Sequence, residues 1–313
     1  MITVFGSINM DMVFFVKKLP MPGETVICPN YSLIPGGKGA NQAVACSRTL
    51  PSLSLTPIML FGNVGKDLFG ERLVESLFRE KIQTEGIHTT SESTGCASIW
   101  VDHRGENSIV SASGANETLS HKQVSDDVLS KSKILLTQLE TPVPENCHLI
   151  TRAFEKGVPV ILNTAPAFPV PLDVLKKVST LVMNTTEAQM IASALHLTYS
   201  SFKELVVQLA QRSGGTCIIT LGAQGLLAAT PNYLYTLETF KVTPIDTTAA
   251  GDTFTGALAT QLFLNIDLPE ALRFASLAAS LSCLKKGAQS SIPTYDEIDE
   301  KMSLMPFPQE ESL

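Results

Sequence analysis

Between residues 134 and 221 the chain reads Ile134-Leu-Leu-Thr-Gln138, Pro159-Val-Ile-Leu-Asn163, Leu181-Val-Met-Asn184 and Thr216-Cys-Ile-Ile-Thr-Leu221. These four segments are short and apolar, which is typical of buried strands. The segments that separate them have helical character. Because strands that alternate with helices form parallel sheets with helices on both faces, the sequence predicts an α/β fold with a doubly wound, mostly parallel sheet.

Two segments before this stretch break the alternation. Residues 12–34 and 96–112 each contain short β-branched or aromatic runs around turn residues, which is typical of hairpins. Hairpins do not fit a parallel sheet, so we expect them to form a small antiparallel β lid built from insertions. We therefore predict a single α/β domain over residues 1–302 that carries this lid. The last residues, 303–313, are rich in Pro, Glu and Ser and are expected to form a flexible tail.

The composition excludes several classes of protein. Hydrophobic residues make up 44% of the 313 residues and charged residues 17%, which is the balance of a folded globular protein. The net charge of -7 repels nucleic acid, and no apolar run is long enough to predict a membrane span. The first residues lack the basic region of a signal peptide, and the six cysteines contain no C-x-x-C pair. We expect a cytoplasmic protein with reduced thiols and no membrane or nucleic-acid partner.

A helix entrance is expected in Asp246-Thr-Thr-Ala-Ala-Gly-Asp-Thr-Phe-Thr-Gly256, which leads into an apolar helical periodicity. Ala249, Ala250 and Gly251 have almost no side chain, so an anion could approach their N–H groups, and the helix dipole favours negative charge there. Asp252 lies beside this anion site, where a general base for phosphoryl transfer would be needed. Read alone, Asp252 could equally be a capping carboxylate.

A second glycine-rich entrance is Pro35-Gly-Gly-Lys-Gly-Ala-Asn-Gln42. Its glycines would let backbone amides approach a small polar ligand, and Lys38 and Asn41 would add directed donors. Alone, it could also be a turn followed by a helix start. It lacks the spacing of a Walker P-loop, and no G-x-G-x-x-G follows the first strand. The five histidines show no metal-ligand spacing.

Five motifs in this order resemble the PfkB, or ribokinase-like, carbohydrate kinase family over essentially the whole chain. Two of them are family signatures, namely Gly36-Gly-Lys-Gly-Ala-Asn41, preceded by Gly6-Ser-Ile-Asn-Met-Asp11, and Asp246-Thr-Thr-Ala-Ala-Gly-Asp252. Between them lie Gln138-Leu-Glu-Thr-Pro142, Asn184-Thr-Thr-Glu187 and Thr220-Leu-Gly-Ala-Gln-Gly225. The chain departs from the family pattern at Thr185, where a glutamate is familiar.

The resemblance implies a sugar site and a catalytic base. It assigns the sugar hydroxyls to Asn9, Asp11, Gly37, Lys38, Gly39, Asn41 and Glu140. It places Asp252 against the reacting hydroxyl, with Ala249, Ala250 and Gly251 forming the anion site. Carboxylates and amides suit a polyol because each can make two hydrogen bonds. Without the resemblance, Asn9 and Asp11 would be interpreted as a turn pair, and Glu140 as a solvated loop acid.

The resemblance also implies ATP, Mg²⁺ and an activating K⁺. It assigns Asn184 and Glu187 to the phosphates and their magnesium, with Glu187 acting through water; Glu187 alone would be interpreted as a first-turn helix glutamate. The nucleotide is expected against Thr220, Gly222, Gly225 and Gly251, with Ser276 near the adenine. Potassium is expected among Asp246, Thr248, Ser282, Lys285, Gly287 and Ser291, largely through backbone oxygens.

The activity that the resemblance implies is transfer of the γ-phosphate of ATP to the 5-hydroxyl of ribose, in a homodimer formed through the β lid. Three other interpretations remain open at this point: a related kinase for deoxyribose, fructose or another sugar, a nucleoside kinase, and a sugar-binding regulator with a silent kinase fold. A nicotinamide dehydrogenase is disfavoured because the glycine fingerprint is missing.

Overall fold

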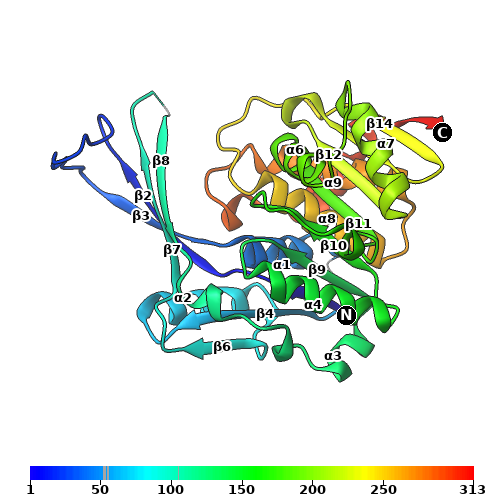
Figure 1. Ribbon diagram of the computed structural model, residues 1–313. Coiled ribbons are helices and arrows are strands. Elements are labelled where there is room, and N and C mark those ends of the chain that lie inside the picture. Colours follow the sequence, from blue (N-terminus) through cyan, green and yellow to red (C-terminus); the bar gives the residue numbers. More distant parts are fainter. Residues whose placement is uncertain (52–53, 55, 105) are drawn as a thin grey trace.

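The computed structural model describes residues 1–51, 54, 56–104 and 106–313, so Gly105 of the expected lid segment lies outside the described residues. A large sheet runs through the body of the molecule (Figure 1). Its strands lie in the order β15 (Gln309–Ser312), β14 (Tyr233–Leu237), β13 (Leu226–Ala229), β12 (Thr216–Thr220), β11 (Thr180–Asn184), β10 (Val160–Asn163), β9 (Ile134–Gln138), β1 (Ile2–Phe5), β4 (Ile58–Gly65) and β5 (Ile82–Gln83), with β6 (Ile87–Thr90) also paired to β4.

The pairing from β5 to β12 is parallel throughout, and only the last three pairs, β12 to β15, are antiparallel. The four segments that opened the sequence argument form β9, β10, β11 and β12, in neighbouring positions of the sheet. The prediction of a doubly wound, mostly parallel sheet is therefore confirmed.

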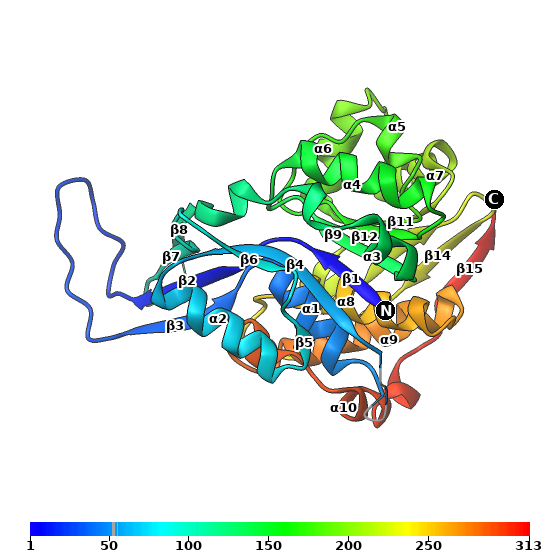
Figure 2. The same cartoon turned by 90° about the horizontal axis from the view of Figure 1, so that it is seen from below.

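Helices cover both faces of the sheet, as Figure 2 shows from below. One face carries α1 (Lys38–Arg48), α2 (Leu68–Arg79), α8 (Ala250–Phe263), α9 (Leu268–Ser282) and α10 (Tyr295–Asp299). The other carries α3 (Asp126–Lys131), α4 (Val143–Glu155), α5 (Leu172–Leu175), α6 (Thr185–Ala194) and α7 (Phe202–Ser213). Short 3-10 turns are η1 (Gly114–Thr118), η2 (His121–Gln123), η3 (Gly222–Gln224), η4 (Gln289–Ser291) and η5 (Met302–Leu304).

Alternation along the strands divides the core between these two layers. In β9, Ile134 and Leu136 pack with the α1, α8 and α9 layer, whereas Leu135 packs with the layer that contains α4. Successive side chains of a strand point to opposite faces, so a strand buried on both faces has to be apolar at every position. This is why the four segments are continuous apolar runs.

A separate four-stranded sheet projects from the body (Figure 1). Its strands lie in the order β3 (Tyr31–Gly36), β2 (Asn9–Phe15), β7 (Gly95–Val101) and β8 (Asn107–Ala112). The lid predicted from residues 12–34 and 96–112 is therefore present. Its outer pairs are antiparallel as expected, but its central pair, β2 with β7, is parallel.

The end of the chain differs from the expected flexible tail. Residues Gln309–Ser312 form β15, which pairs with β14, and Arg273 donates to the carbonyl oxygens of Met302, Met305 and Pro306 just before it. A polar segment can add to a sheet edge because the pairing uses main-chain groups and not side chains. No helix in the described part of the chain has both the length and the apolar character needed to cross a bilayer.

Candidate active site

A cleft of about 210 Å³ opens at the carboxyl ends of the parallel strands. Asn163, Asn184 and Thr220, the last residues of β10, β11 and β12, line it. The first helix after β1, α1, and the first helix after the neighbouring β9, α4, pack on opposite faces of the sheet. Ligands of open α/β sheets bind at such a switch point. A second cleft, of about 540 Å³, lies at the opposite strand ends and contains none of the residues assigned a role above.

Eight of the predicted site residues line the 210 Å³ cleft together. They are Lys38, Asn184, Glu187, Thr220, Ala249, Ala250, Gly251 and Asp252. They come from α1, β11, α6, β12 and the start of α8, which are far apart in the sequence. The structure therefore brings the two glycine-rich motifs and the phosphate-side motif to one place.

Asp252 lies in the first turn of α8, but it does not cap the helix. The N-terminal residue Ala249 has a φ of 60°, and no side chain caps this end. Instead, Asp252 is only 6% exposed and accepts hydrogen bonds from Asn41 Nδ2 at 3.0 Å and Gln42 Nε2 at 2.9 Å. The carboxylate is thus held at the cleft by α1, which excludes the capping interpretation.

The start of α8 has the properties of an anion site. The N–H groups of Gly251 and Asp252 belong to the first helical turn and have no intrahelical acceptor, whereas that of Ala250 donates to Thr247 O at 3.3 Å. Apart from its chain neighbours and the backbone of its own helix, no described heavy atom lies within 4 Å of the position that a Cβ on Gly251 would take. The space beside these N–H groups is therefore open to a ligand.

Glu140 connects the loop after β9 to the loop after β1. Its carboxylate accepts hydrogen bonds from Ser7 Oγ and from the backbone N–H of Lys38, the latter at 2.9 Å. The interpretation as a solvated loop acid is therefore wrong: Glu140 fixes the entrance of α1.

Around Lys38 there are more acidic side chains than basic ones, and burial and their charges shift several pKa values. Burial, followed by the charge of Glu140, raises the pKa of Asp11 to about 6. Burial also raises the pKa of Glu187. The Asp252 carboxylate, which outweighs the effect of burial, raises the pKa of Lys38 above its ordinary value. Glu187 and Lys38 line the cleft, whereas Asp11 is not among its lining residues. Perturbed groups in a cleft are typical of a functional site.

The remaining residues expected to hold the sugar have different local roles. Asn9 Oδ1 accepts a hydrogen bond from Asn116 Nδ2 at 2.7 Å. Gly37 has a φ of 86°, and a Cβ there would meet the backbone of Ser7, Ile8 and Asn9. Gly39 lies against the backbone of Gly6, where a Cβ would also clash. The two glycines allow α1 to begin close to the β1–β2 connection.

Asn184 and Glu187 form a capping box at the start of α6. Asn184 Oδ1 accepts from Glu187 N at 2.9 Å, and Glu187 Oε2 accepts from Asn184 N at 2.8 Å. The first-turn interpretation of Glu187 therefore describes its local structure correctly. Because both side chains also line the cleft, the cap places a carboxylate and an amide beside the anion site.

The residues expected near the nucleotide are spread beyond the cleft. Gly222 has a φ of 59° and open space around it, whereas a Cβ on Gly225 would collide with Leu237 O. Ser276 is buried in α9, where its carbonyl accepts from Ser280 Oγ. Thr220, at the end of β12, lines the cleft itself.

The segment expected to surround potassium is tied together by Asp246. Its two carboxylate oxygens accept hydrogen bonds from the N–H groups of Thr248 and Gly287, both at 2.9 Å. These bonds outweigh the effect of burial and lower the pKa of Asp246. The hydroxyls of Ser282 and Ser291 bond nearby carbonyl oxygens, and Lys285 pairs with Glu297.

Several residues of this site carried no recognisable signal in the sequence. Gln42 Nε2 donates to Asp252 Oδ1 at 2.9 Å and to Asn163 Oδ1 at 3.1 Å. Ser7 Oγ donates a hydrogen bond to Glu140, and Asn116 Nδ2 donates one to Asn9 Oδ1. Asparagine, glutamine and serine are common in loops and caps, so only their tertiary partners reveal these roles.

His121 and His148 lie close together away from this cleft. Ligand atoms of His121, Glu145 and His148 lie within 4.8 Å of one another. Glu145, however, already accepts from Ser120 Oγ and His121 N, and the Arg152 guanidinium contacts His121 O at 2.6 Å. These bonds explain the cluster as a connection between η2 and α4.

Comparison with known proteins gives a consistent result. The model of the pfkB family carbohydrate kinases matches residues 1–295. The ribokinase of Haemophilus influenzae is 40% identical over 95% of this chain and 96% of that protein. The crystal structure of Thermotoga maritima ribokinase is 32% identical, with a TM-score of 0.90 over 96% of this chain and 99% of that one. Arabidopsis thaliana ribokinase complexed with ribose and ATP is 28% identical, with a TM-score of 0.85 over 96% and 98%.

Proposed function

Because this chain belongs to the pfkB family of carbohydrate kinases, we propose that it transfers the γ-phosphate of ATP to the 5-hydroxyl of D-ribose, with Asp252 as the general base. The choice of ribose is supported by the relatives compared above, which are named ribokinases. The observation that carries the mechanism is the position of Asp252, a buried carboxylate at the mouth of a helix whose first N–H groups face an open cleft.

In this mechanism the sugar lies between the lid and the sheet. Asn9, Asp11, Asn41 and Glu140 accept or donate hydrogen bonds to its hydroxyls, together with the glycine-rich entrance of α1. Asp252 accepts the proton of the 5-hydroxyl as that oxygen attacks the γ-phosphorus, and the bond from the γ-phosphorus to the bridging oxygen breaks, so that ADP leaves. Asn41 and Gln42 keep the carboxylate at a fixed orientation, so no reorganisation is needed at the moment of transfer.

The phosphate side of the cleft stabilises the charge that develops on the transferring group. The N–H groups of Gly251 and Asp252 point toward the γ-phosphate, and Lys38 contributes a cation whose raised pKa keeps it charged. Thr220, Gly222 and Gly225 support the rest of the nucleotide, with Ser276 near the adenine.

The donors present fit the two metals that the family implies. Glu187 and Asn184 offer a carboxylate and an amide oxygen in the cleft, a set that suits a hydrated Mg²⁺. Asp246 and the backbone carbonyl groups of Thr248, Ser282, Lys285, Gly287 and Ser291 suit K⁺, which prefers carbonyl oxygens. When bound, the metals would supply positive charge that offsets the phosphates and the cluster of carboxylates.

We further propose that the protein acts in the cytoplasm as a homodimer formed through the lid. The lid exposes Phe15, Tyr31, Ile109 and Val110, and exposed apolar side chains on a sheet favour association.

The test is a coupled assay of ADP release with ribose, deoxyribose, fructose and adenosine, each with and without K⁺. We expect the largest kcat/KM with ribose, a product phosphorylated on its 5-oxygen, and faster turnover in K⁺. A larger kcat/KM for another acceptor would replace ribose, and ADP release that does not depend on any acceptor would reject the kinase assignment.

A further inference from the structure

Helix α1 contacts the segment that contains η4 at two points. Gln289 Nε2 donates to Asn41 Oδ1 at 3.3 Å, and Arg48 Nη1 donates to the backbone oxygen of the same Gln289 at 2.9 Å. Asn41 and Arg48 are seven residues apart on α1, which is two helical turns, so they lie on one face of the helix. One rigid helix therefore holds both the side chain and the main chain of Gln289.

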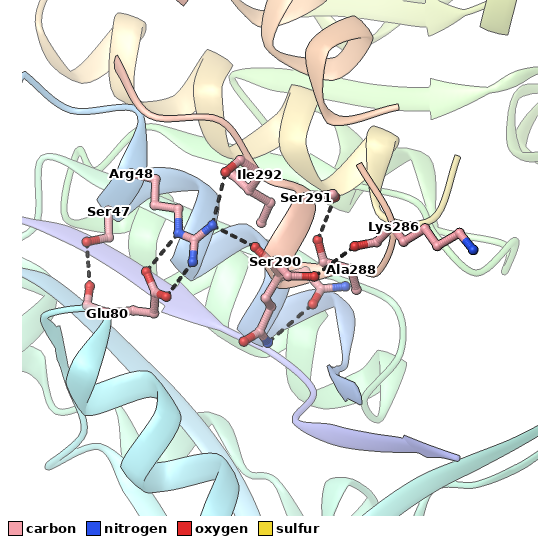
Figure 3. Close-up of polar contacts among 10 residues, drawn as sticks. Ser47, Arg48, Glu80, Lys286, Ala288, Ser290, Ser291 and Ile292 are labelled. Atoms are coloured by element: carbon pink, nitrogen blue, oxygen red, sulfur yellow. Dashed lines mark hydrogen bonds and ion pairs between the residues drawn. The ribbon is translucent and has the colours of Figure 1, made fainter. Parts of the chain in front are cut away.

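Arg48 is itself fixed in place (Figure 3). Its guanidinium pairs with both carboxylate oxygens of Glu80, at 2.8 and 2.5 Å, and also donates to Ile292 O at 3.0 Å. A guanidinium held at two oxygens of one carboxylate has a defined plane. Two residues before Gln289, Gly287 N donates to Asp246 Oδ2 at 2.9 Å. The main chain is thus held both before and after Gln289.

The contact between Gln289 and Asn41 matters because Asn41 binds Asp252. A carboxamide can turn over, which exchanges its donor and its acceptor. Asn41 has to present Nδ2 to Asp252 at 3.0 Å, and its Oδ1 then faces Gln289. Asn41, Asp252 and Gln289 are 6%, 6% and 5% exposed, so water contributes little and an unmatched donor or acceptor is costly.

We propose that Gln289 is a positioning residue for the phosphoryl transfer: by donating to Asn41 Oδ1 it selects the orientation in which Asn41 holds Asp252. The effect reaches the base through Asn41, because Gln289 is not among the residues that line the 210 Å³ cleft. This inference rests on the proposed role of Asp252. It also connects the segment expected to surround potassium to the catalytic carboxylate, through one side-chain hydrogen bond.

The test compares two variants of nearly unchanged size with a control from the same turn. Gln289→Met removes the donor, and Gln289→Glu replaces it with a carboxylate that draws Asn41 Nδ2 away from Asp252. We expect kcat to fall about tenfold for Gln289→Met and further for Gln289→Glu, with the KM for ATP within twofold. The melting temperature should fall in both variants, because Asn41 Oδ1 loses its buried donor. Ser290→Ala removes only the hydrogen bond to Lys286 O and should retain the wild-type kcat.

A double-mutant cycle separates positioning from general structural support. Adding Gln289→Met to Asn41→Ala should cause no further loss of kcat/KM, because the link is already broken. If the double variant instead lost kcat/KM by the product of the two single losses, the proposal would be wrong. It would also be wrong if Gln289→Met kept a kcat within twofold of wild type, or if Ser290→Ala lost as much kcat as Gln289→Met.

A readout that does not need activity distinguishes this proposal from the proposed function. The side-chain amide hydrogens of Asn41, followed by NMR in the full chain, should exchange faster in Gln289→Met than in the wild-type protein or in Ser290→Ala. If the wild-type chain phosphorylates no sugar, the proposed function fails while faster exchange still supports the Gln289–Asn41 link. Equal exchange rates would overturn the link itself.

Discussion

Asn41 donates a hydrogen bond of 3.0 Å to the carboxylate of Asp252, although 211 positions of sequence separate the two residues. This bond joins α1 to α8, and it explains why the two glycine-rich motifs belong to one site. The helices can approach because their contact surfaces are small: Cys46 Sγ lies 3.5 Å from Gly256 O. Five predictions concern the site and the helices that support it.

Replacing the base should abolish turnover and leave the fold intact. Asp252→Asn retains the shape of the side chain but cannot accept the proton, so we expect kcat to fall by about 10²–10⁴-fold, the usual contribution of a general base. Steady-state assays with ribose would measure this, and Asp173→Asn on the exposed surface of α5 serves as the control. Turnover of Asp252→Asn within tenfold of wild type would show that another group takes the proton.

Asp11 should make sugar binding sensitive to acid. Its pKa is raised to about 6 by burial and by Glu140 and Asp252, with Lys38 opposing this. Below about pH 6 the protonated carboxyl has fewer acceptors for sugar hydroxyls, so the KM for ribose should rise as the pH falls. In Asp11→Asn, KM should be high and nearly independent of pH between about 5 and 7. A pH-dependent rise that persists in Asp11→Asn would assign the titration to another group.

The same carboxyl should lower the stability of the folded protein at neutral pH. Its folded-state pKa exceeds the ordinary 3.8, so the native state binds more protons than the unfolded chain between about pH 4 and 6. The free energy of unfolding therefore falls as pH rises through this window. Asp11→Asn should be more stable than wild type at pH 7, by up to about 3 kcal/mol, as measured by urea denaturation. A less stable variant would contradict this.

Substituting alanine at two different glycines of α8 should have opposite effects on the stability of the protein. A Cβ at Gly251 meets no atom within 4 Å, so Gly251→Ala should keep or slightly increase stability while the methyl group obstructs the phosphate and lowers kcat at least about tenfold. A Cβ at Gly256 collides with Ala45, so Gly256→Ala should destabilise the protein by about 1–3 kcal/mol. Thermal melts and kinetics on both variants would test this, and full activity of Gly251→Ala would argue against a phosphate there.

Two arginine–glutamate pairs should differ sharply in their contribution to stability. Arg48 pairs with Glu80 at side-chain exposures of 24% and 25% and also binds two carbonyl oxygens. Arg79 pairs with Glu75 at exposures of 73% and 61%. We expect Arg48→Met to cost about 2–4 kcal/mol and Arg79→Met less than about 0.5 kcal/mol, measured by denaturant unfolding. Equal costs would show that the Arg48 contacts add little.

The sequence indicated the parts of this protein that depend on local pattern. Apolar runs such as residues 134–138 predicted the sheet, and small residues before Asp252 predicted an anion site at a helix entrance. Roles that depend on distant partners could not be predicted. Nothing near Gln289 or Asn116 in the chain indicates that each binds an asparagine of the site, more than 100 positions away. The polar residues of β15 likewise gave no sign of the edge that they join.

A connection of three residues joins the body to the lid, because strand β1 of the body ends at Phe5 and strand β2 of the lid begins at Asn9. Gly6, Ser7 and Ile8 form this connection, and Ile8 N donates to Asn116 Oδ1 at 2.9 Å. Asn9 and Asp11 belong to β2 of the lid, whereas Asp252 belongs to α8 of the body. In the proposed mechanism the sugar is therefore bound by both parts, so a displacement of the lid relative to the body would change the distance between the reacting hydroxyl and Asp252.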